Sequence, residues 1–291
     1  MTALGVVFLP QNPPERLRAI ARAADEAGLD ELWLWEDCFL ESGIATAAAA
    51  LAWTERLRIG VGLLPVPLRN VAITAMEVAT LDRLFPGRVT IGIGHGVQSW
   101  MEQVGARAES PMTLLDEYLD ALRALLRGER VTTRGRYVTL DEVALDWPPP
   151  TAPPIYLGVV KPRTLALAGA AADGTILTGG TTPDRVREVR AVLDKAGAAA
   201  GRTERQPIVV YLQAATGPTA AARMEAQRLR WGYGPDADVV AMGDAKAIAT
   251  AAQRWYDAGA DTVVLQPTPD DPDPEGFVRF VATEVRPLVA T

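Results

Sequence analysis

The chain has 291 residues, of which 48% are hydrophobic, with a formal net charge of −7 and a single cysteine, Cys38. This acidic balance, without a lysine-arginine tract or alternating basic and aromatic residues, argues against a nucleic-acid partner, and one cysteine excludes an internal disulfide or a cysteine-cluster metal site. No apolar run approaches the roughly 18 residues of a membrane span and no leader-like segment opens the chain, so we expect a cytoplasmic protein with no membrane partner.

The first third of the chain alternates short apolar runs with segments of helical period. The apolar runs are rich in β-branched residues, which favour strands, and proline or glycine marks several helix boundaries. The expected order is strand Leu4–Leu9, helix Pro14–Gly28, strand Asp30–Glu36, helix Gly43–Thr54, strand Leu57–Leu64, helix Val71–Leu84 and strand Val89–Gly94.

After the fourth strand this rhythm breaks, and residues 97–152 read as an insertion. Residues 97–111 lack a clear period, residues 113–126 form an amphipathic helix, and residues 130–140 resemble a hairpin that turns at Arg134-Gly135. An insertion of this size between two strands usually builds part of an active-site wall. We expect it to shape a substrate pocket with Trp100, Met101 and Tyr118.

The alternation then resumes and continues to the end of the chain. A glycine-rich segment, residues 231–243, precedes the last strand as a second insertion. The expected order is strand Ile155–Val159, helix Pro162–Ala171, strand Asp173–Thr178, helix Pro183–Ala200, strand Ile208–Ala214, helix Pro218–Arg230, helix Ala245–Ala258, strand Asp261–Gln266 and a closing helix around Pro274–Leu288.

Three joints repeat a small-residue helix end, an aspartate and a strand. They are Gly28-Leu29-Asp30, Ala171-Ala172-Asp173 and Gly259-Ala260-Asp261, which indicate one helix-to-strand turn used three times. Eight strand-helix units predict a single α/β domain over residues 1–291, a closed (β/α)8 TIM barrel with insertions chiefly between strands 4 and 5 and before strand 8. The main rival is a doubly wound open sheet, but this chain has no G-x-G-x-x-G turn after its first strand.

Gly92, Gly94 and Gly96 alternate at the end of the fourth strand and frame His95, the only histidine. Without Cβ atoms, these glycines let a flat ligand or another part of the barrel approach closely. His95 is a candidate general acid or hydrogen-bond donor, and a structural role remains the alternative. One histidine without a carboxylate cluster falls short of a metal site, so we expect no metal.

Glu36 and Asp37 follow the second strand and are candidate proton donors or acceptors. Apolar neighbours and mutual repulsion would raise the pKa of such carboxyl groups. The alternative is an ordinary polar strand end. Trp33 and Trp35 alternate, so they share one face, and either core packing or a pocket wall would accommodate them.

The segment Thr178-Gly179-Gly180-Thr181 joins a strand to a helix whose expected cap is Thr182. Glycines, hydroxyls and free amides at a helix start suit a phosphate group, and plain capping is the alternative. Lys161 would add positive charge; a Schiff-base role would require it to lie in an apolar pocket. Cys38 has no paired base in sequence, so a buried thiol is expected.

The chain resembles the bacterial luciferase-like superfamily, and within it the deazaflavin-dependent branch that includes methylenetetrahydromethanopterin reductase-like oxidoreductases. The similarity covers nearly the whole chain through motifs that are individually loose. They are Trp35-Glu36-Asp37, Arg58 to Pro65 with Arg69, Ala79 to Asp82, Pro86 to Val89, Gly92 to Gly96, and Leu167 to Gly174.

This resemblance implies coenzyme F420, or alternatively FMN, at the carboxyl face of the barrel, with the ring against a bulged third strand that often has a non-proline cis peptide. It further implies a small-molecule substrate and a homodimer, for which the small-residue helix Ala45–Ala52 is weak support. The implied cofactor-binding residues, with Phe8 added from the first strand end, are Phe8, Gly62, Leu63, Leu64, Gly94, His95, Gly96, Gly158, Val159, Val160, Lys161, Thr178, Gly179, Gly180 and Thr181.

The chain departs from the sugar-phosphate dehydrogenases of this branch. Those enzymes have a histidine after the aspartate of the second strand and a glutamate after the fourth-strand glycines, where this chain has Cys38 and Val97. We therefore expect hydride transfer between F420 and a different small organic substrate, with Glu36, Asp37 or His95 handling protons. The alternatives are an FMN-dependent monooxygenase and a non-catalytic flavin-binding relative.

Overall fold

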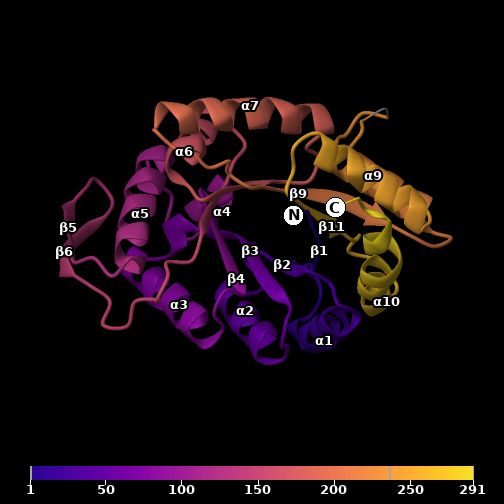
Figure 1. The fold of residues 1–291 in the computed structure, drawn as a ribbon, viewed down its shortest axis with the longest axis horizontal. Coiled ribbons are helices and arrows are strands. Elements are labelled where there is room, and N and C mark those ends of the chain that lie inside the picture. The colour runs from indigo at the N-terminus through magenta and orange to yellow at the C-terminus, as the bar shows by residue number, and fades with distance from the viewer. Residues whose placement is uncertain (1, 236, 291) are drawn as a thin grey trace.

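Eight parallel strands close into a barrel that helices cover on the outside (Figure 1). The structure, a computed structural model, describes residues 2–235 and 237–290. Because the last strand pairs with the first and each other strand pairs with its neighbours, the predicted (β/α)8 barrel is confirmed. Around the barrel the strands are β1 (Ala3–Val7), β2 (Glu31–Leu34), β3 (Arg58–Pro65), β4 (Val89–Gly94), β7 (Ile155–Gly158), β8 (Gly174–Leu177), β9 (Ile208–Ala215) and β11 (Thr262–Gln266).

Most of the helices lie where the sequence predicted them. Thr182 caps α7 by accepting a hydrogen bond from the Arg185 N–H, with Pro183 at the first helical position. Gly28 ends α1 in the left-handed conformation, with φ 76°. The helices are α1 (Leu17–Ala27), α2 (Gly43–Ala52), α3 (Val71–Leu84), α4 (Gln98–Gln103), α5 (Pro111–Leu126), α6 (Pro162–Ala171), α7 (Pro183–Ala199), α8 (Ala220–Trp231), α9 (Ala245–Asp257) and α10 (Pro274–Phe280).

The three repeated aspartates each tie a helix-to-strand turn to the start of the neighbouring strand. The Oδ2 atoms of Asp30, Asp173 and Asp261 accept hydrogen bonds from the backbone N–H groups of Leu4, Ile155 and Ile208, at 3.2, 3.0 and 2.8 Å respectively. This confirms that one turn is used three times. Each aspartate also pairs with an arginine, namely Arg286, Arg123 and Arg190.

The barrel interior is a small apolar core, separate from the larger core between the strands and the helices. Val7, Trp33, Tyr211 and Val264 belong to it. Side chains on a strand alternate between two faces, so residues two positions further along these strands also point inward. A Cβ on Gly60 would overlap the indole of Trp33, so this position requires glycine.

Three local features differ from the expectations. The aperiodic stretch after the fourth strand contains the short helix α4, and the glycine-rich insertion contains β10 (Val240–Met242), which lengthens the pairing of β9. The closing helix is interrupted after Phe280 by a π-helical turn, residues 281–285, and a 3-10 turn, residues 286–288. Each is too short for its period to stand out in sequence.

The insertion divides into two parts. Its helix α5 packs between α3 and α6 as a barrel helix, while the predicted hairpin, β5 (Val131–Arg134) and β6 (Thr139–Val143), lies on the outer side of α5 (Figure 1). Met101 and Tyr118 are buried in the protein core, and Tyr118 donates a hydrogen bond to Thr74 Oγ1. The expectation that these two side chains shape the pocket is wrong, because α4 and α5 turn them inward.

None of the helices in the described ranges combines the length and apolar character that crossing a membrane requires.

Candidate active site at the carboxyl end of the barrel

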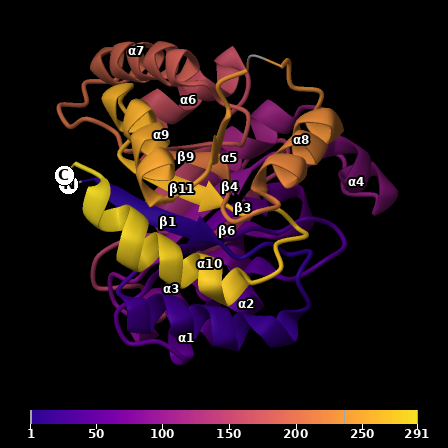
Figure 2. The same ribbon diagram turned by 90° about the vertical axis from the view of Figure 1, so that its right-hand side faces the viewer.

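A cavity of about 1210 Å³ lies at the carboxyl ends of the barrel strands. Helices α4 and α8 lie at the same end of the barrel (Figure 2). Trp100 from α4 and Trp231 from α8 line the cavity. Trp35 also reaches the cavity, whereas Trp33 stays in the inner core. The predicted residues that line the cavity are Glu36, Asp37, Gly62, Leu63, His95, Gly96, Gly158, Val159, Val160, Lys161, Thr178 and Gly179.

Five residues from the predicted cofactor set are absent from the described lining. Phe8 is 2% exposed and belongs to the outer core, and Leu64 packs toward Gly43 beneath α2. Leu63 covers Gly94, while the ring of Tyr233 lies over Gly180. Thr181 turns back, donating its hydroxyl hydrogen to the Thr178 carbonyl oxygen at 2.7 Å. Alternating side-chain direction explains Phe8, because only every second residue of a strand faces the interior.

Leu63 forms part of the cavity floor. The pairing of β3 with β4 shifts register between Val61 and Leu64, and the Gly62-Leu63 peptide bond is cis. A Cβ on Gly94 would lie 2.7 Å from Leu63 Cδ2, and one on Gly158 would also fall below 3.0 Å. These two glycines therefore make room for the Leu63 side chain, which in turn faces the cavity.

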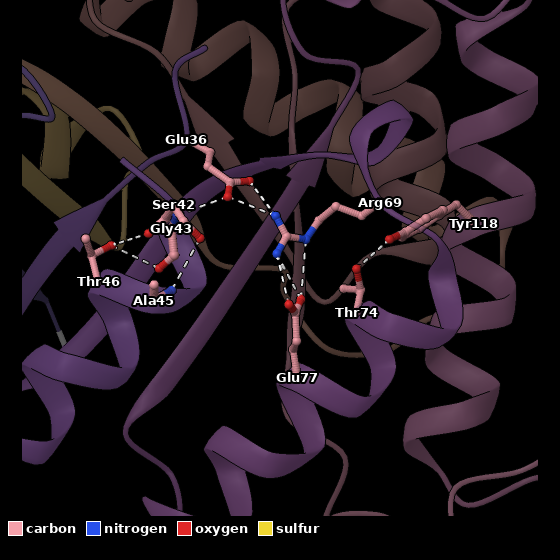
Figure 3. A network of polar contacts seen from close by, with 9 residues as sticks. All are labelled: Glu36, Ser42, Gly43, Ala45, Thr46, Arg69, Thr74, Glu77 and Tyr118. Atoms are coloured by element: carbon pink, nitrogen blue, oxygen red, sulfur yellow. Dashed lines mark hydrogen bonds and ion pairs between the residues drawn. The ribbon is translucent and has the colours of Figure 1, made fainter. Parts of the chain in front are cut away.

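Glu36 is held by a network of ion pairs (Figure 3). Its two carboxylate oxygens accept hydrogen bonds from Arg69 Nη1 at 2.8 and 2.9 Å, and Oε1 also accepts one from the Gly43 N–H at 3.1 Å. Arg69 binds Glu77 through its other nitrogens. The side chains of Glu36 and Arg69 are only 12% and 15% exposed. This pairing fixes Glu36 as part of the cavity wall.

Asp37 is less constrained than Glu36 and lies at the cavity wall. Its Oδ2 accepts a hydrogen bond from the indole N–H of Trp35 at 2.9 Å. Burial raises the pKa of Asp37, and the Trp35 hydrogen bond opposes this only in part. A carboxyl group with a raised pKa is suited to donating a proton.

His95 contributes a neutral imidazole to the wall. Its Nε2 lies 3.3 Å from Thr164 Oγ1, and Nδ1 is buried with no hydrogen-bond partner among the described residues. Burial lowers the pKa of His95, contact with the Pro111 backbone opposes this in part, and the positive charge of Lys161 lowers the pKa further. Uncharged imidazole is therefore favoured near neutral pH.

Positive charge gathers where the loop after β7 meets the cavity. Lys161 and Arg163 line that part, and Thr178 and Gly179, from the loop after the neighbouring strand β8, also line the cavity. This is the arrangement expected for a phosphate-bearing ligand, with cationic side chains and backbone amides at one end of an otherwise largely apolar space.

Sequence reasoning missed two side chains that shape the site. Tyr211 donates its hydroxyl hydrogen to the Gly62 carbonyl oxygen at 3.0 Å, which links β9 to the bulge in β3. Gln213 lines the cavity two residues further along β9. The two-residue period of that strand was the available signal, but identifying which face points inward requires the barrel.

Comparisons with known proteins agree with this architecture. Residues 2–273 match the family model of luciferase-like monooxygenases. The chain is 29% identical over 196 residues to 5,10-methylenetetrahydromethanopterin reductase of Methanolobus tindarius, covering 66% of this chain and 60% of that protein. It is 33% identical over 210 residues to an F420-dependent glucose-6-phosphate dehydrogenase of Kineococcus radiotolerans, covering 67% and 62%.

The matches span about 55–62% of the length of the curated relatives. Among solved structures, an F420-dependent secondary alcohol dehydrogenase in complex with an F420-acetone adduct superposes with a TM-score of 0.88. The superposition covers 100% of this chain and 99% of that one at 20% identity, which supports the barrel fold. Since the family model covers nearly the whole sequence, the chain belongs to the luciferase-like monooxygenase family.

Proposed function

We propose that the protein is an F420-dependent oxidoreductase that transfers hydride between the deazaflavin and a small organic substrate. The observation that carries this proposal is the cavity above Leu63, with a largely apolar floor and the cationic residues Lys161 and Arg163 near one end. Curated relatives whose names state F420 dependence support the deazaflavin.

The residues present fit such a cofactor. Leu63, seated on Gly94 and Gly158, offers an apolar surface for one face of a tricyclic ring. Lys161, with the backbone near Thr178 and Gly179, would hold a phosphate. When bound, F420 supplies the hydride chemistry. Of the five predicted residues outside the described lining, Gly94 would act by giving room to the Leu63 side chain.

Asp37 is the residue that we propose as the proton donor. Trp35 orients its carboxyl group through Oδ2, which leaves Oδ1 to hold the proton that a substrate oxygen receives. Glu36 is bound to Arg69, so we assign it a positioning role at the strand end. His95 is assigned to the cavity wall as an uncharged hydrogen-bonding group.

The alternative is an FMN-dependent monooxygenase, which the name of the family favours. A non-catalytic flavin-binding protein is the third reading. Oxygen consumption with FMN and a reductase would support the monooxygenase, whereas anaerobic hydride transfer from reduced F420 would support the dehydrogenase or reductase. Retained cofactor binding without turnover would support the non-catalytic protein.

Parallel titrations with F420 and FMN test the proposal. We expect F420 to change its absorbance on binding and to raise the unfolding temperature more than FMN does at equal concentration, because binding to the folded state stabilises it. Anaerobic screening of ketones, enones and imines with reduced F420 should then reveal turnover that Asp37→Asn lowers by about 10²-fold. No spectral change and no thermal stabilisation by F420 would overturn the proposal.

A further inference from the structure

Gln213 has a buried amide oxygen with no hydrogen-bond partner among the described residues. The residue is 3% exposed, and its Oε1 is buried and accepts no hydrogen bond from any residue in the described ranges. Gln213 also lines the cavity. Buried polar atoms are almost always hydrogen-bonded in folded proteins, so this oxygen marks a place where a ligand would supply the donor.

The position of Gln213 is set by the barrel. It follows Tyr211 by two residues and shares its inward face, one side-chain layer or about 7 Å nearer the cavity. Because Tyr211 is hydrogen-bonded to the Gly62 carbonyl oxygen, this layer begins at the bulge that carries Leu63. Leu63 and Gln213 line the same cavity, so a flat molecule resting on Leu63 shares this space with the Gln213 side chain.

A second amide lies beside the first. Gln266 at the end of β11 pairs in register with Gln213 and also lines the cavity. Gly179 lies next to both side chains: its Cβ position would be 3.5 Å from Gln266 Oε1 and 4.0 Å from Gln213 Cγ. The absence of a side chain at Gly179 leaves space around the two amides.

The side chains of Gln213 and Gln266 themselves carry no charge. The cations among the described lining residues, Lys161, Arg163 and Arg230, come from the segment after β7 and from α8, not from β9 or β11. A carboxamide presents one acceptor beside one donor. Its best neutral complement is a cis-amide edge, in which a ring N–H stands next to a ring carbonyl.

We propose that Gln213, with Gln266 beside it, recognises a cis-amide edge of the molecule bound over Leu63. Oε1 accepts the ring N–H and Nε2 donates to the adjacent carbonyl oxygen. The inference rests on the proposed function, which places a cofactor and a substrate in this cavity. Either molecule can present a cis-amide edge: the deazaflavin or flavin through its pyrimidine ring, and the substrate if it is a lactam.

The first test uses lumiflavin and 3-methyllumiflavin, which differ only in the ring N–H. Fluorescence titration of the wild-type protein should give a Kd at least tenfold lower for lumiflavin if the cofactor edge is recognised. Gln213→Met, which keeps the length of the side chain, should bind both probes equally. Gln253→Leu is the matched control on the outer helix α9, where the amide binds Asp257 and Ala290, and it should retain the wild-type ratio.

The second test uses 5,6-dihydropyridin-2(1H)-one and its N-methyl derivative, titrated calorimetrically into the protein with F420 present. At least tenfold preference for the N–H lactam, abolished by Gln213→Met, assigns the amide to substrate recognition. Preference in the flavin pair assigns it to the cofactor. Preference in neither pair overturns the proposal, and this comparison needs only the wild-type protein.

The two proposals fail separately. If F420 binds but neither probe pair is distinguished, the role of Gln213 is wrong and the proposed function stands. If lumiflavin is distinguished from its methylated form while F420 does not bind, the role of Gln213 stands and the deazaflavin assignment is wrong.

Discussion

Both carboxylate oxygens of Glu36 accept hydrogen bonds from the same guanidinium nitrogen of Arg69, at 2.8 and 2.9 Å. The two residues are 33 positions apart in the chain, and the pair joins the end of β2 to the start of α3. Glu77, from the second turn of α3, binds the other side of the guanidinium (Figure 3). The wall of the cavity beside Asp37 is thus fixed by one guanidinium that bridges two carboxylates.

We expect Arg69→Met to lower the free energy of unfolding by about 3 kcal/mol, because it leaves two largely buried carboxylates without their partner. Urea denaturation monitored by circular dichroism measures the change. The control is Arg107→Met, which breaks a pair with Glu102 in which the two side chains are 54% and 66% exposed, and it should cost less than about 1 kcal/mol. Equal losses in the two variants would refute a special role for Arg69.

Gly158→Ala should weaken F420 or FMN binding by at least about tenfold, a loss of roughly 1.4 kcal/mol. The added methyl group would overlap Leu63 Cδ2 and push the Leu63 side chain into the cavity. Leu63→Ala in the same protein should restore part of the affinity by removing the overlap. Gly234→Ala serves as the control, since no described atom lies within 4 Å of its Cβ position; fluorescence titration compares all four proteins.

The imidazole of His95 should titrate below pH 6.5, because burial and the charge of Lys161 both disfavour the protonated ring. As the chain has one histidine, NMR of untagged protein labelled at histidine reports this group alone. Lys161→Met should raise the midpoint toward 6.5, and Lys246→Met, on α9, should leave it unchanged. A midpoint that does not respond to Lys161→Met would show that this lysine does not face the ring.

Glu41 should make the protein less stable as the pH rises. Burial, and then the charge of Glu15, raise the pKa of Glu41 to about 7, and its buried Oε1 has no hydrogen-bond partner among the described residues. A raised pKa in the folded state means that the proton is bound more tightly there than in the unfolded chain. The stabilisation is therefore complete below about pH 4.5 and is lost as the pH rises through 7.

Glu41→Gln removes this dependence, so the variant should unfold at a higher temperature than the wild type at pH 8, by roughly 2 °C for a contribution of about 1 kcal/mol. Solvent screening limits the contribution of Glu41 to the free energy of unfolding, because its carboxyl group is partly exposed. At pH 4 the two proteins should unfold together. Glu26→Gln, at an exposed position, is the control and should give the same difference from wild type at both pH values.

The sequence by itself determined the eight barrel strands, most of the helices and the barrel that they form, but not the short elements α4 and β10. Local signals suffice for these features: apolar alternation marks β4, proline and a threonine cap mark the start of α7, and an aspartate marks each of three equivalent turns. Each signal lies within a few residues of the element it specifies, so no knowledge of distant parts of the chain is required.

Only the tertiary structure decided what the predicted site residues contact. Glu36 is paired with Arg69, Leu63 fills the space that Gly94 and Gly158 leave open, and Gln213 faces the cavity with an amide oxygen that no residue of the described ranges hydrogen-bonds. The first two relationships join residues tens of positions apart in the chain, and the third depends on which side of β9 points into the barrel. The sequence of a strand shows that its side chains alternate between two faces, but the closure of the barrel decides which of these side chains face inward.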